Sequence, residues 1–530
     1  MRNLAKHVST RVTPQSRPIP GKNQAQNNAG GYSYVLDCWH RLQRFLILGS
    51  EGGTYYVGER DLTAANANVV MECAVADPAR TVEMVASISE DGRAPRNDPA
   101  ILALAVLSAQ NDPAVRRLAL EALPRVCRTG THLFQFIAAC KELRGWGRGL
   151  REAVAKWYND KPLEKLAYQV TKYRNRAGYT HRDILRLSHP KTAEYDRNCL
   201  YHWIVKGEAP NLLPDSLSLV DGLEAANALS PDDVKQMLRL IGEYKLTLEH
   251  VPNHFLSSPL VWEALLPNLP PAAMIRNLGK MTSVGLLRPL SGSTKLVYDV
   301  LTNSDRLRGA RVHPLSVLIA ADTYSQGHGV KGGLTWQPVG QIRDALEEAF
   351  YSAFDAVEST GKRHLLALDV SGSMGWSYLA NTQLSAAKAA ACMSMVTHRV
   401  ELQTHVMGFS DSLVHIDISK KERLDALVQK IGAIPMGRTD CSIPMVYAKQ
   451  NRIEVDAFVV YTDNETWAGS IHPSQALVQY RQAMGIDAKL IVVGMTATQF
   501  TIADPSDPGM LDVVGMDSSV PQVMRDFVGQ

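Results

Sequence analysis

Three short oxygen-bearing side chains stand at alternate positions directly after an apolar run. Leu365–Leu368 lead into Asp369, Ser371 and Ser373, and a glycine between the two serines gives the backbone freedom for a tight turn. The apolar run is typical of a strand buried on both faces of a mostly parallel sheet. Carboxylate and hydroxyl oxygens, with no Cys or His among them, suit a hard cation. We therefore expect one divalent ion here, Mg²⁺ first, with Mn²⁺ and Ca²⁺ as alternatives.

Two later positions complete this set. The loop 435–440 offers Thr439, and the apolar run 457–462 ends at Asp463. The five residues in this order resemble the metal-ion-dependent adhesion site of von Willebrand factor A domains. The resemblance implies that the hydroxyls lie near the ion, that the aspartates hold its waters, and that one coordination position stays open for a partner's carboxylate. The alternative is a helix N-cap, since Ser and Asp also cap helices. The position after a buried strand favours the metal site.

The most basic part of the chain is a different stretch. Residues 141–191 hold 13 Lys and Arg against 5 Asp and Glu, together with several aromatic residues. At its centre, residues 172–183, closely spaced cations surround a Gly break, as in a loop that contacts phosphates. The alternative is a solvated helix face with its aromatic residues in the core, which we favour for the tyrosines alone. The cations have few carboxylates among them and predict an anionic partner.

Composition and charge restrict the class of protein. The 530 residues are 45% hydrophobic, as in globular proteins. No apolar run reaches the roughly 18 residues of a membrane span, and no signal peptide is indicated. Seven cysteines without a Cys-x-x-Cys pair predict reduced thiols in an intracellular, cytoplasmic protein. The net charge is +3, but 42 Lys and Arg against 36 Asp and Glu precede Lys362, so an anionic partner is expected for the first part.

The pattern along the chain predicts three parts, of α and then α/β class. Residues 1–31 are polar and rich in Asn, Gln, Gly and Pro, which favours a flexible arm. Residues 32–360 predict helices throughout, with Asp77, Asp98 and Asp112 as N-caps before Pro. These helices favour stacked pairs of the HEAT type, with an irregular bundle as the alternative. Residues 361–530 alternate strands and helices, as in a doubly wound α/β domain with its site at the carboxyl ends of the strands.

A basic helical part followed by an adhesion-type part resembles the Ro autoantigen family, the Y-RNA-binding Ro ribonucleoproteins. The resemblance covers nearly the whole chain. It rests on Lys172–Arg176 through Leu185–His189, and on Gly327–Gly329 leading to Thr360–Arg363 and the Asp369 motif. It implies that the helical repeats close into a ring with Y RNA on its outer surface. It also implies that single-stranded 3′ ends of misfolded noncoding RNAs enter the central hole, in RNA quality control.

The same resemblance implies which residues contact RNA and which partners to expect. The RNA-contacting positions of the family fall here on Lys172, Arg176 and His189, with neighbours at Arg174, His181 and Arg182. Bacterial members of the family are tied to an exoribonuclease. An exoribonuclease or another protein is therefore a candidate partner through the metal site, and the missing basic nuclear-localisation run favours a bacterial member.

An enzymatic function is not expected. The glycine-rich loop Gly327–Gly333 lacks the Gly-Lys-Ser/Thr ending and the preceding strand of a phosphate-binding loop, so it predicts a connection. We find no nucleophile–base pair, and the surroundings of Asp369 do not suit two-metal phosphodiester chemistry. The alternative to an RNA-binding ribonucleoprotein is a metal-dependent protein-adhesion scaffold without an RNA role. Identifying any RNA that copurifies with the protein would discriminate the two.

Overall fold

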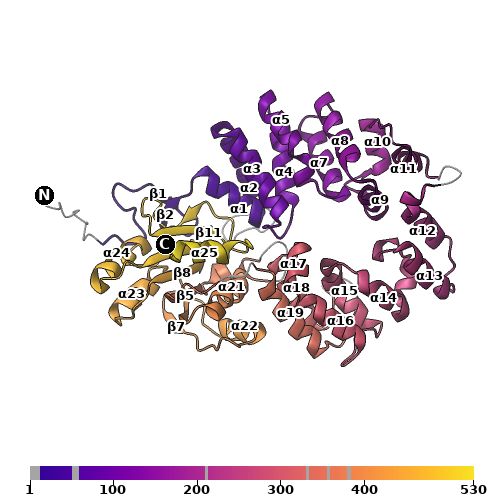
Figure 1. Ribbon diagram of the computed structural model, residues 1–530. Coiled ribbons are helices and arrows are strands. Elements are labelled where there is room, and N and C mark those ends of the chain that lie inside the picture. Colours follow the sequence, from indigo (N-terminus) through magenta and orange to yellow (C-terminus); the bar gives the residue numbers. More distant parts are fainter. Residues whose placement is uncertain are drawn as a thin grey trace. The chain divides into compact units, whose positions relative to one another are not determined.

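The chain folds into two units, shown in Figure 1. The computed structural model describes residues 12–49, 59–208, 213–329, 333–354, 358–378 and 384–529. One unit, called here the α/β unit, combines residues 1–66 with residues 355–530, and the helical unit comprises residues 67–354. The predicted succession of a helical part and an α/β part is confirmed. The boundary differs, because the start of the chain belongs to the second part.

A six-stranded sheet in the order β11-β9-β8-β5-β6-β7 forms the centre of the α/β unit. All neighbours are parallel except β7, which runs antiparallel to β6. The strands are β5 (Arg363–Asp369), β6 (Gln403–Phe409), β7 (Leu413–His415), β8 (Ala457–Thr462), β9 (Lys489–Gly494) and β11 (Met510–Val514). The central strand β8 is buried along its whole length, because both faces of the sheet are covered.

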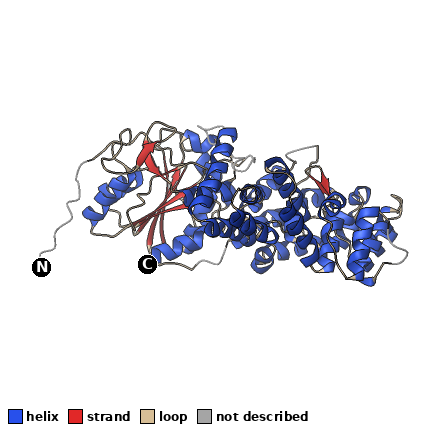
Figure 2. Cartoon of the chain, turned by 90° about the horizontal axis from the view of Figure 1, so that it is seen from above, coloured by secondary structure: helices blue, strands red, loops and turns tan. Residues whose placement is uncertain are grey.

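Helices lie on either side of this sheet (Figure 2). They are α20 (Gly372–Trp376), α21 (Ala386–Val400), α22 (Leu424–Gly432), α23 (Ile443–Gln450), α24 (Pro473–Met484) and α25 (Val520–Gly529). On one face, α23 and α24 bury Met445, Leu477 and Tyr480 in a core with the strands. The helix α21 packs against β5. The alternation of strands and helices predicted from residue 361 onward is therefore present.

Residues 12–36, called here the N-terminal strap, are not the flexible arm that composition predicted. The strap forms β1 (Gln24–Gln26) and β2 (Tyr32–Val35), which make an antiparallel sheet with β10 (Phe500–Thr501). It is followed by α1 (Cys38–Leu48), which contacts β11. Composition was misleading here because Gln and Asn side chains of the strap hydrogen-bond to buried backbone groups of the protein, whereas in a flexible arm they would hydrogen-bond to water. Residues 1–11 of the predicted arm lie outside the described residues.

The helical unit is built from helices that pack mainly on their neighbours along the chain, as in helical-repeat proteins. Its helices are α2 (Glu59–Ala76), α3 (Pro78–Asp91), α4 (Asp98–Ser108), α5 (Pro113–Glu121), α6 (Leu123–Val126), α7 (Gly130–Leu143), α8 (Arg148–Asp160), α9 (Leu163–Lys172), α10 (His181–Ser188), α11 (Tyr195–Lys206), α12 (Ser218–Asn227), α13 (Val234–Tyr244), α14 (Pro259–Leu265), α15 (Pro271–Ser283), α16 (Gly292–Leu301), α17 (Ser304–Gly309), α18 (Pro314–Gln326) and α19 (Gly340–Ser352). A short hairpin, β3 (Asn175–Arg176) and β4 (Tyr179–Thr180), interrupts them. Asp77 and Asp112 cap α3 and α5 as predicted, whereas Asp98 is itself the first residue of α4.

Helices from the two ends of the helical unit meet. The Nε2 atom of His313, at the start of α18, lies 2.9 Å from the carbonyl oxygen of Arg93, just after α3. Gly92 at the end of α3 lies against the side chain of Arg311. The chain therefore returns on itself over more than two hundred residues. This contact between the ends is what a closed arrangement of repeats requires.

Two general expectations concern the whole chain. All seven cysteines are free thiols, as the absence of paired motifs predicted. Among the residues that the structure describes, no helix is both long enough and apolar enough to cross a membrane.

Candidate metal site and nucleic-acid interface

Adjacent parallel strands bring the two predicted aspartates together. Asp369 is the last residue of β5, and Asp463 directly follows β8, its hydrogen-bonded neighbour. Because the carboxyl ends of parallel strands meet at one edge of the sheet, both carboxyl groups lie at that edge. At the same edge, Ser371 directly precedes α20 and Ser373 lies in its first turn. Thr439 lies in the loop before α23.

Short hydrogen bonds connect these side chains. The Ser371 amide donates to Asp369 Oδ1 over 2.9 Å, and the hydroxyls of Ser371 and Ser373 are 3.1 Å apart. Ser373 in turn hydrogen-bonds the Asp463 carboxyl group. The Thr439 carbonyl accepts from the amides of Trp467 and Ala468, each over 3.1 Å, which ties its loop to the segment after β8. The structure therefore brings four predicted residues into one hydrogen-bonded chain, with Thr439 in the adjoining loop.

Both carboxyl groups are buried. Asp369 and Asp463 are 0% and 2% exposed. Burial, with the charge of Asp463 as the second cause, raises the pKa of Asp369 to about 7. Burial also raises the pKa of Asp463, although the hydrogen bond from Ser373 opposes this. Among the described residues, no Lys or Arg is hydrogen-bonded to either carboxyl group, so a bound cation would compensate the charge that burial penalises.

The donor chemistry fits a hard cation. Ser371 precedes α20, but its hydroxyl makes no capping hydrogen bond to the backbone amides of the first turn, which disfavours the N-cap alternative. No group of three His, Cys, Asp or Glu side chains within the described ranges could hold a metal ion. The site therefore depends on hydroxyl donors beside two carboxylates, a set that suits Mg²⁺ rather than a soft metal.

The predicted RNA-contacting residues lie around the β3–β4 hairpin and α10. Ala177 and Gly178 connect its strands with positive φ values of 51° and 76°, as in a two-residue turn of the primed type. Arg174 and Arg176 are exposed on the hairpin, and Arg182 is exposed in the first turn of α10. His189, also exposed, ends α10 in the left-handed conformation. The hairpin and this helix therefore present four of the six predicted residues to solvent.

Lys172 is a partly structural residue. Its side chain is only 11% exposed, and its ammonium group pairs with Glu249 over 3.0 Å and donates to the Tyr168 hydroxyl over 2.9 Å. The same group lies over the rings of Tyr168 and Tyr173. Burial opposes the charged form, but these partners together raise the pKa of Lys172. The cation is therefore retained, yet most of its donors are used inside the protein.

His181, predicted as a neighbour of the RNA-contacting residues, is not part of the exposed surface, because its side chain is buried. The ring is 3% exposed, and Nδ1 lies 2.7 Å from the Tyr158 hydroxyl. It packs edge-on against Phe134 at 4.6 Å between ring centroids. Burial lowers the pKa of His181 to about 3, so the ring is neutral at physiological pH. It is the first residue of a helix whose buried face it joins, which a count of local cations does not reveal.

A basic cavity of about 1080 Å³ lies where the ends of the helical unit meet. Among the described residues, its lining contains no Asp or Glu but five Lys or Arg: Arg96, Arg128, Arg276, Lys280 and Arg311. The Nε of Arg128 is buried without a hydrogen-bond partner. Burial, followed by the charge of Arg311, lowers the pKa of Arg128. Trp336, stacked on Tyr324 at 6.0 Å, also lines the cavity, which therefore offers both charge and an aromatic surface.

Comparisons with known proteins agree with this arrangement of parts. One family model, described as the Ro60 vWA domain, matches residues 363–528, and another, the TROVE domain, matches residues 25–209 and 239–326. The RNA-binding protein RO60 of Deinococcus radiodurans is 41% identical over 530 residues, which are 99% of each chain. The chain belongs to the Ro60 family. The resemblance found in the sequence is therefore confirmed.

Two further relatives of the Ro60 family support this assignment. The RNA-binding protein RO60 of Caenorhabditis elegans is 36% identical over 584 residues, covering 95% of this chain and 90% of that one. The crystal structure of the Ro (Rsr) protein of Deinococcus radiodurans superposes with a TM-score of 0.71 at 41% identity, covering 93% of this chain and 99% of that one. The fold, a helical region followed by a von Willebrand factor A domain, is thus that of a known Ro protein.

Sequence analysis missed several residues of the candidate metal site and of the basic cavity. Thr462 donates to Asp369 Oδ2 over 2.6 Å, and the buried Glu465 accepts from Asn28 over 2.6 Å. The polar run Thr462–Thr466 directly after an apolar strand was a usable signal for both residues. The cavity cations had no such signal, because Arg128 and Arg311 are far apart in the chain and meet only in the folded unit.

Proposed function

We propose that this protein binds small structured noncoding RNA of the Y-RNA kind on the surface formed by the β3–β4 hairpin and α10. The observation that carries the proposal is the exposure of Arg174, Arg176 and Arg182 on adjoining elements. Exposed guanidinium groups at this spacing neutralise successive phosphates and release counterions. His189, exposed at the end of α10, adds a further donor beside them. The curated relatives are named as RNA-binding proteins, which supports the same class of ligand.

We propose further that single-stranded 3′ ends of misfolded noncoding RNAs enter the basic cavity of the helical unit. Cations that line a cavity follow a sugar–phosphate backbone irrespective of sequence, and the described lining of this cavity includes no carboxylate. The half-buried Trp336 ring in the same lining offers a surface on which a base of any kind can stack. Such a site distinguishes a free tail from a paired end by shape rather than by sequence. This role belongs to a scaffold in RNA quality control, and no step of it requires the protein to be an enzyme.

The third part of the proposal is a divalent cation, Mg²⁺ in the first place, held by Asp369, Ser371, Ser373, Thr439 and Asp463. We propose that it binds an acidic segment of a protein partner, for which an exoribonuclease is the candidate. Exposed apolar side chains beside the donors support a protein surface, since Trp376 and Met436 are 62% and 59% exposed. A metal-dependent adhesion scaffold without RNA is the second candidate, and this surface is the observation in its favour.

The RNA surface is tested by reversing charge on the hairpin. The variant Arg174→Glu with Arg176→Glu should weaken binding of a Y-RNA stem-loop and lower the slope of log affinity against log salt, by ~0.7 to ~0.9 for each lost phosphate contact. Filter binding over a range of salt concentrations measures both quantities. The matched control is Lys235→Glu with Arg239→Glu, two exposed cations on α13. Equal losses in the two variants would mean that only net charge matters and would refute the assigned surface.

The cavity and the metal site have separate tests. Arg276→Glu with Lys280→Glu, both on α15, should weaken binding of an RNA with a free 3′ tail but not of the same RNA with a paired end.

For the metal site, Asp369→Ala with Ser371→Ala should abolish Mn²⁺ and Mg²⁺ binding in calorimetric titrations while the sheet still folds. An unchanged metal isotherm for that double variant would refute the metal assignment and leave the RNA surfaces untouched.

A further inference from the structure

The N-terminal strap contacts each of the three residues that directly follow Asp463. Asn464 O accepts from the Ser33 hydroxyl over 3.2 Å, and Glu465 accepts from the Asn28 amide over 2.6 Å. Thr466 donates its hydroxyl to Gln15 Oε1 over 2.6 Å. Gln15 also donates to Asp440 Oδ1 over 2.7 Å, next to Thr439. Both loops that carry late metal donors are therefore held by side chains from the first 36 residues.

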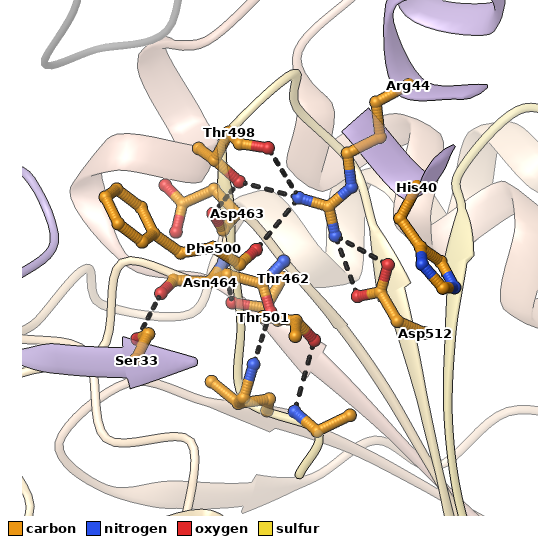
Figure 3. A network of polar contacts seen from close by, with 12 residues as sticks. Ser33, His40, Arg44, Thr462, Asp463, Asn464, Thr498, Phe500, Thr501 and Asp512 are labelled. Carbon is orange, nitrogen blue, oxygen red and sulfur yellow. Dashed lines mark hydrogen bonds and ion pairs between the residues drawn. The ribbon is translucent and has the colours of Figure 1, made fainter. Parts of the chain in front are cut away.

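Helix α1 supplies a second and stronger attachment, through Arg44 (Figure 3). The Arg44 side chain is 2% exposed, and its Nη2 atom donates to both carboxylate oxygens of Asp512 on β11 over 2.7 and 2.9 Å. Its Nη1 atom donates to the carbonyl oxygens of Thr498 and Phe500 over 2.8 and 2.9 Å, and to the Thr498 hydroxyl over 3.0 Å. One guanidinium group thus joins the outer strand β11 to residues 498–500, which lead into β10.

The Thr498 hydroxyl connects Arg44 to the main chain of the proposed metal site. It accepts from Arg44 and donates to the carbonyl oxygen of Asp463 over 3.1 Å. The guanidinium can approach so closely because Gly494, at the end of β9, has no side chain. A Cβ atom there would lie 2.8 Å from Nη2 of Arg44. The main chain of a predicted metal ligand is therefore fixed by a residue more than four hundred positions earlier.

We infer that Arg44 is a positioning residue for the cation site, and that α1 is a structural part of that site. The inference rests on the metal site proposed above. Arg44 lies outside residues 363–528, the part matched as the von Willebrand factor A domain. Groups that orient the ligands of a metal change its affinity by roughly 10- to 100-fold when they are removed. Only the planar fork of arginine reaches all of these acceptors together, so lysine cannot replace it.

Calorimetric titration of the full chain with Mn²⁺ tests this inference. Arg44→Lys should weaken Mn²⁺ binding by ~10-fold or more. The matched control is Arg481→Lys. Arg481, on α24, also joins an aspartate and two carbonyl groups, but before β9 and β11, at the opposite edge of the sheet. The control variant should lose thermal stability and keep its Mn²⁺ affinity within about 2-fold of the unmodified protein.

A second pair of variants tests the link without removing a buried charge. Thr498→Val removes the hydroxyl between Arg44 and Asp463. Thr501→Val removes a similarly buried hydroxyl on the adjoining strand β10, one that accepts from the Ala503 amide. Thr498→Val should weaken Mn²⁺ binding, and Thr501→Val should not. If Arg44→Lys does not fold, this pair of variants tests whether Arg44 positions the cation site.

The outcomes separate the two claims. If the unmodified chain binds Mn²⁺ and the Thr498 variant, or a folded Arg44 variant, binds it equally well, the positioning role is refuted and the metal site stands. If the unmodified chain binds no Mn²⁺, the metal site itself is refuted, and the inference with it.

Discussion

Lys172 illustrates that a cation in a basic stretch can serve the fold as much as a ligand. Its pairing with Glu249, whose side chain is 27% exposed, joins the end of α9 to residues more than seventy positions later. A reversal of its charge would therefore leave Glu249 beside a second carboxylate. Loss of RNA binding in such a variant could come from the fold, which is why Arg174 and Arg176 are the better probes of the surface.

We predict that Lys172→Ala lowers the free energy of unfolding by ~1 to ~3 kcal/mol, because Glu249 loses its partner in a half-buried place. Arg176→Ala, on the exposed hairpin, should change it by less than ~0.5 kcal/mol. Urea unfolding of both variants gives these values. Equal stability of the two variants would show that the Lys172–Glu249 pair contributes nothing to the fold.

The buried His181 predicts sensitivity to acid. An unfolded histidine titrates near 6.5, whereas burial lowers the pKa of His181 to about 3 in the folded protein. Below pH 6.5 the unfolded chain therefore binds a proton that the folded chain does not. The stability that His181 contributes is present above this pH and is lost as the pH falls toward 3. At pH 5 the loss is ~2 kcal/mol.

His181→Gln should therefore flatten the dependence of the urea midpoint on pH between 7.5 and 5, whatever its effect at pH 7.5. The flattening will be partial, because burial also lowers the pKa of His132 and of His250, each to about 4. The exposed His189→Gln variant is the control and should retain the full slope. If His181→Gln keeps the slope of the unmodified protein, His181 is not neutral in the folded state.

At the scale of elements, the N-terminal strap is an integral part of the α/β unit. Gln15 is fully buried, donates to Asp440 and to the Ile471 carbonyl, and accepts from Thr466 and from the Gly469 amide. The NH2 group and the carbonyl oxygen of this side chain therefore each make two hydrogen bonds, all to the loops at the carboxyl end of the sheet. The strap therefore hydrogen-bonds to backbone groups of these loops that would otherwise need water as their partner.

We predict that Gln15→Ala lowers the free energy of unfolding by ~2 to ~4 kcal/mol, because it leaves several buried groups without partners. Gln26→Ala is the matched control, since Gln26 is exposed on β1 and its side-chain amide donates to the nearby Gly30 carbonyl oxygen. Its effect should stay below ~0.5 kcal/mol. Thermal unfolding of the two variants measures the difference, and similar melting temperatures would mean that the strap is only loosely held.

At the scale of the whole molecule, the two units differ less in net charge than the division at Lys362 predicted. The helical unit, residues 67–354, holds 34 Lys and Arg against 30 Asp and Glu, and the remaining residues hold 22 against 23. The difference shrinks because the first 66 residues carry eight Lys or Arg into the α/β unit. We therefore expect the proposed RNA affinity to come from local clusters, the hairpin with α10 and the cavity, rather than from net charge.

The proposed RNA surfaces and the proposed metal site belong to different units, which predicts independent binding. A compact stem-loop RNA that folds without Mg²⁺ should bind equally in excess EDTA and to the Asp369→Ala protein. Filter-binding titrations with and without chelator measure this. A loss beyond ~10-fold, about 1.4 kcal/mol, in both conditions would show that the cation takes part in RNA capture.

The sequence alone determined the features that depend on neighbours in the chain. The apolar run before Asp369 and the run before Asp463 each predict a buried strand with a polar end. The parallel sheet then places both ends at one edge, because that geometry follows from the alternation of strands and helices. The cations of the hairpin were likewise visible as a local cluster. For such features, a periodic pattern and the chemistry of the side chains are sufficient.

Tertiary structure alone decided the features that depend on residues far apart. It buried His181, paired Lys172 with Glu249, and gathered Arg128 and Arg311 around one cavity. It also ordered a polar strap that composition assigned to a flexible arm, and it joined both the strap and Arg44 of α1 to the loops that carry the proposed metal donors. The reason is physical. Burial and pairing are set by which surfaces meet on folding, and a polar side chain whose partners are distant has the same local sequence as one that water would satisfy.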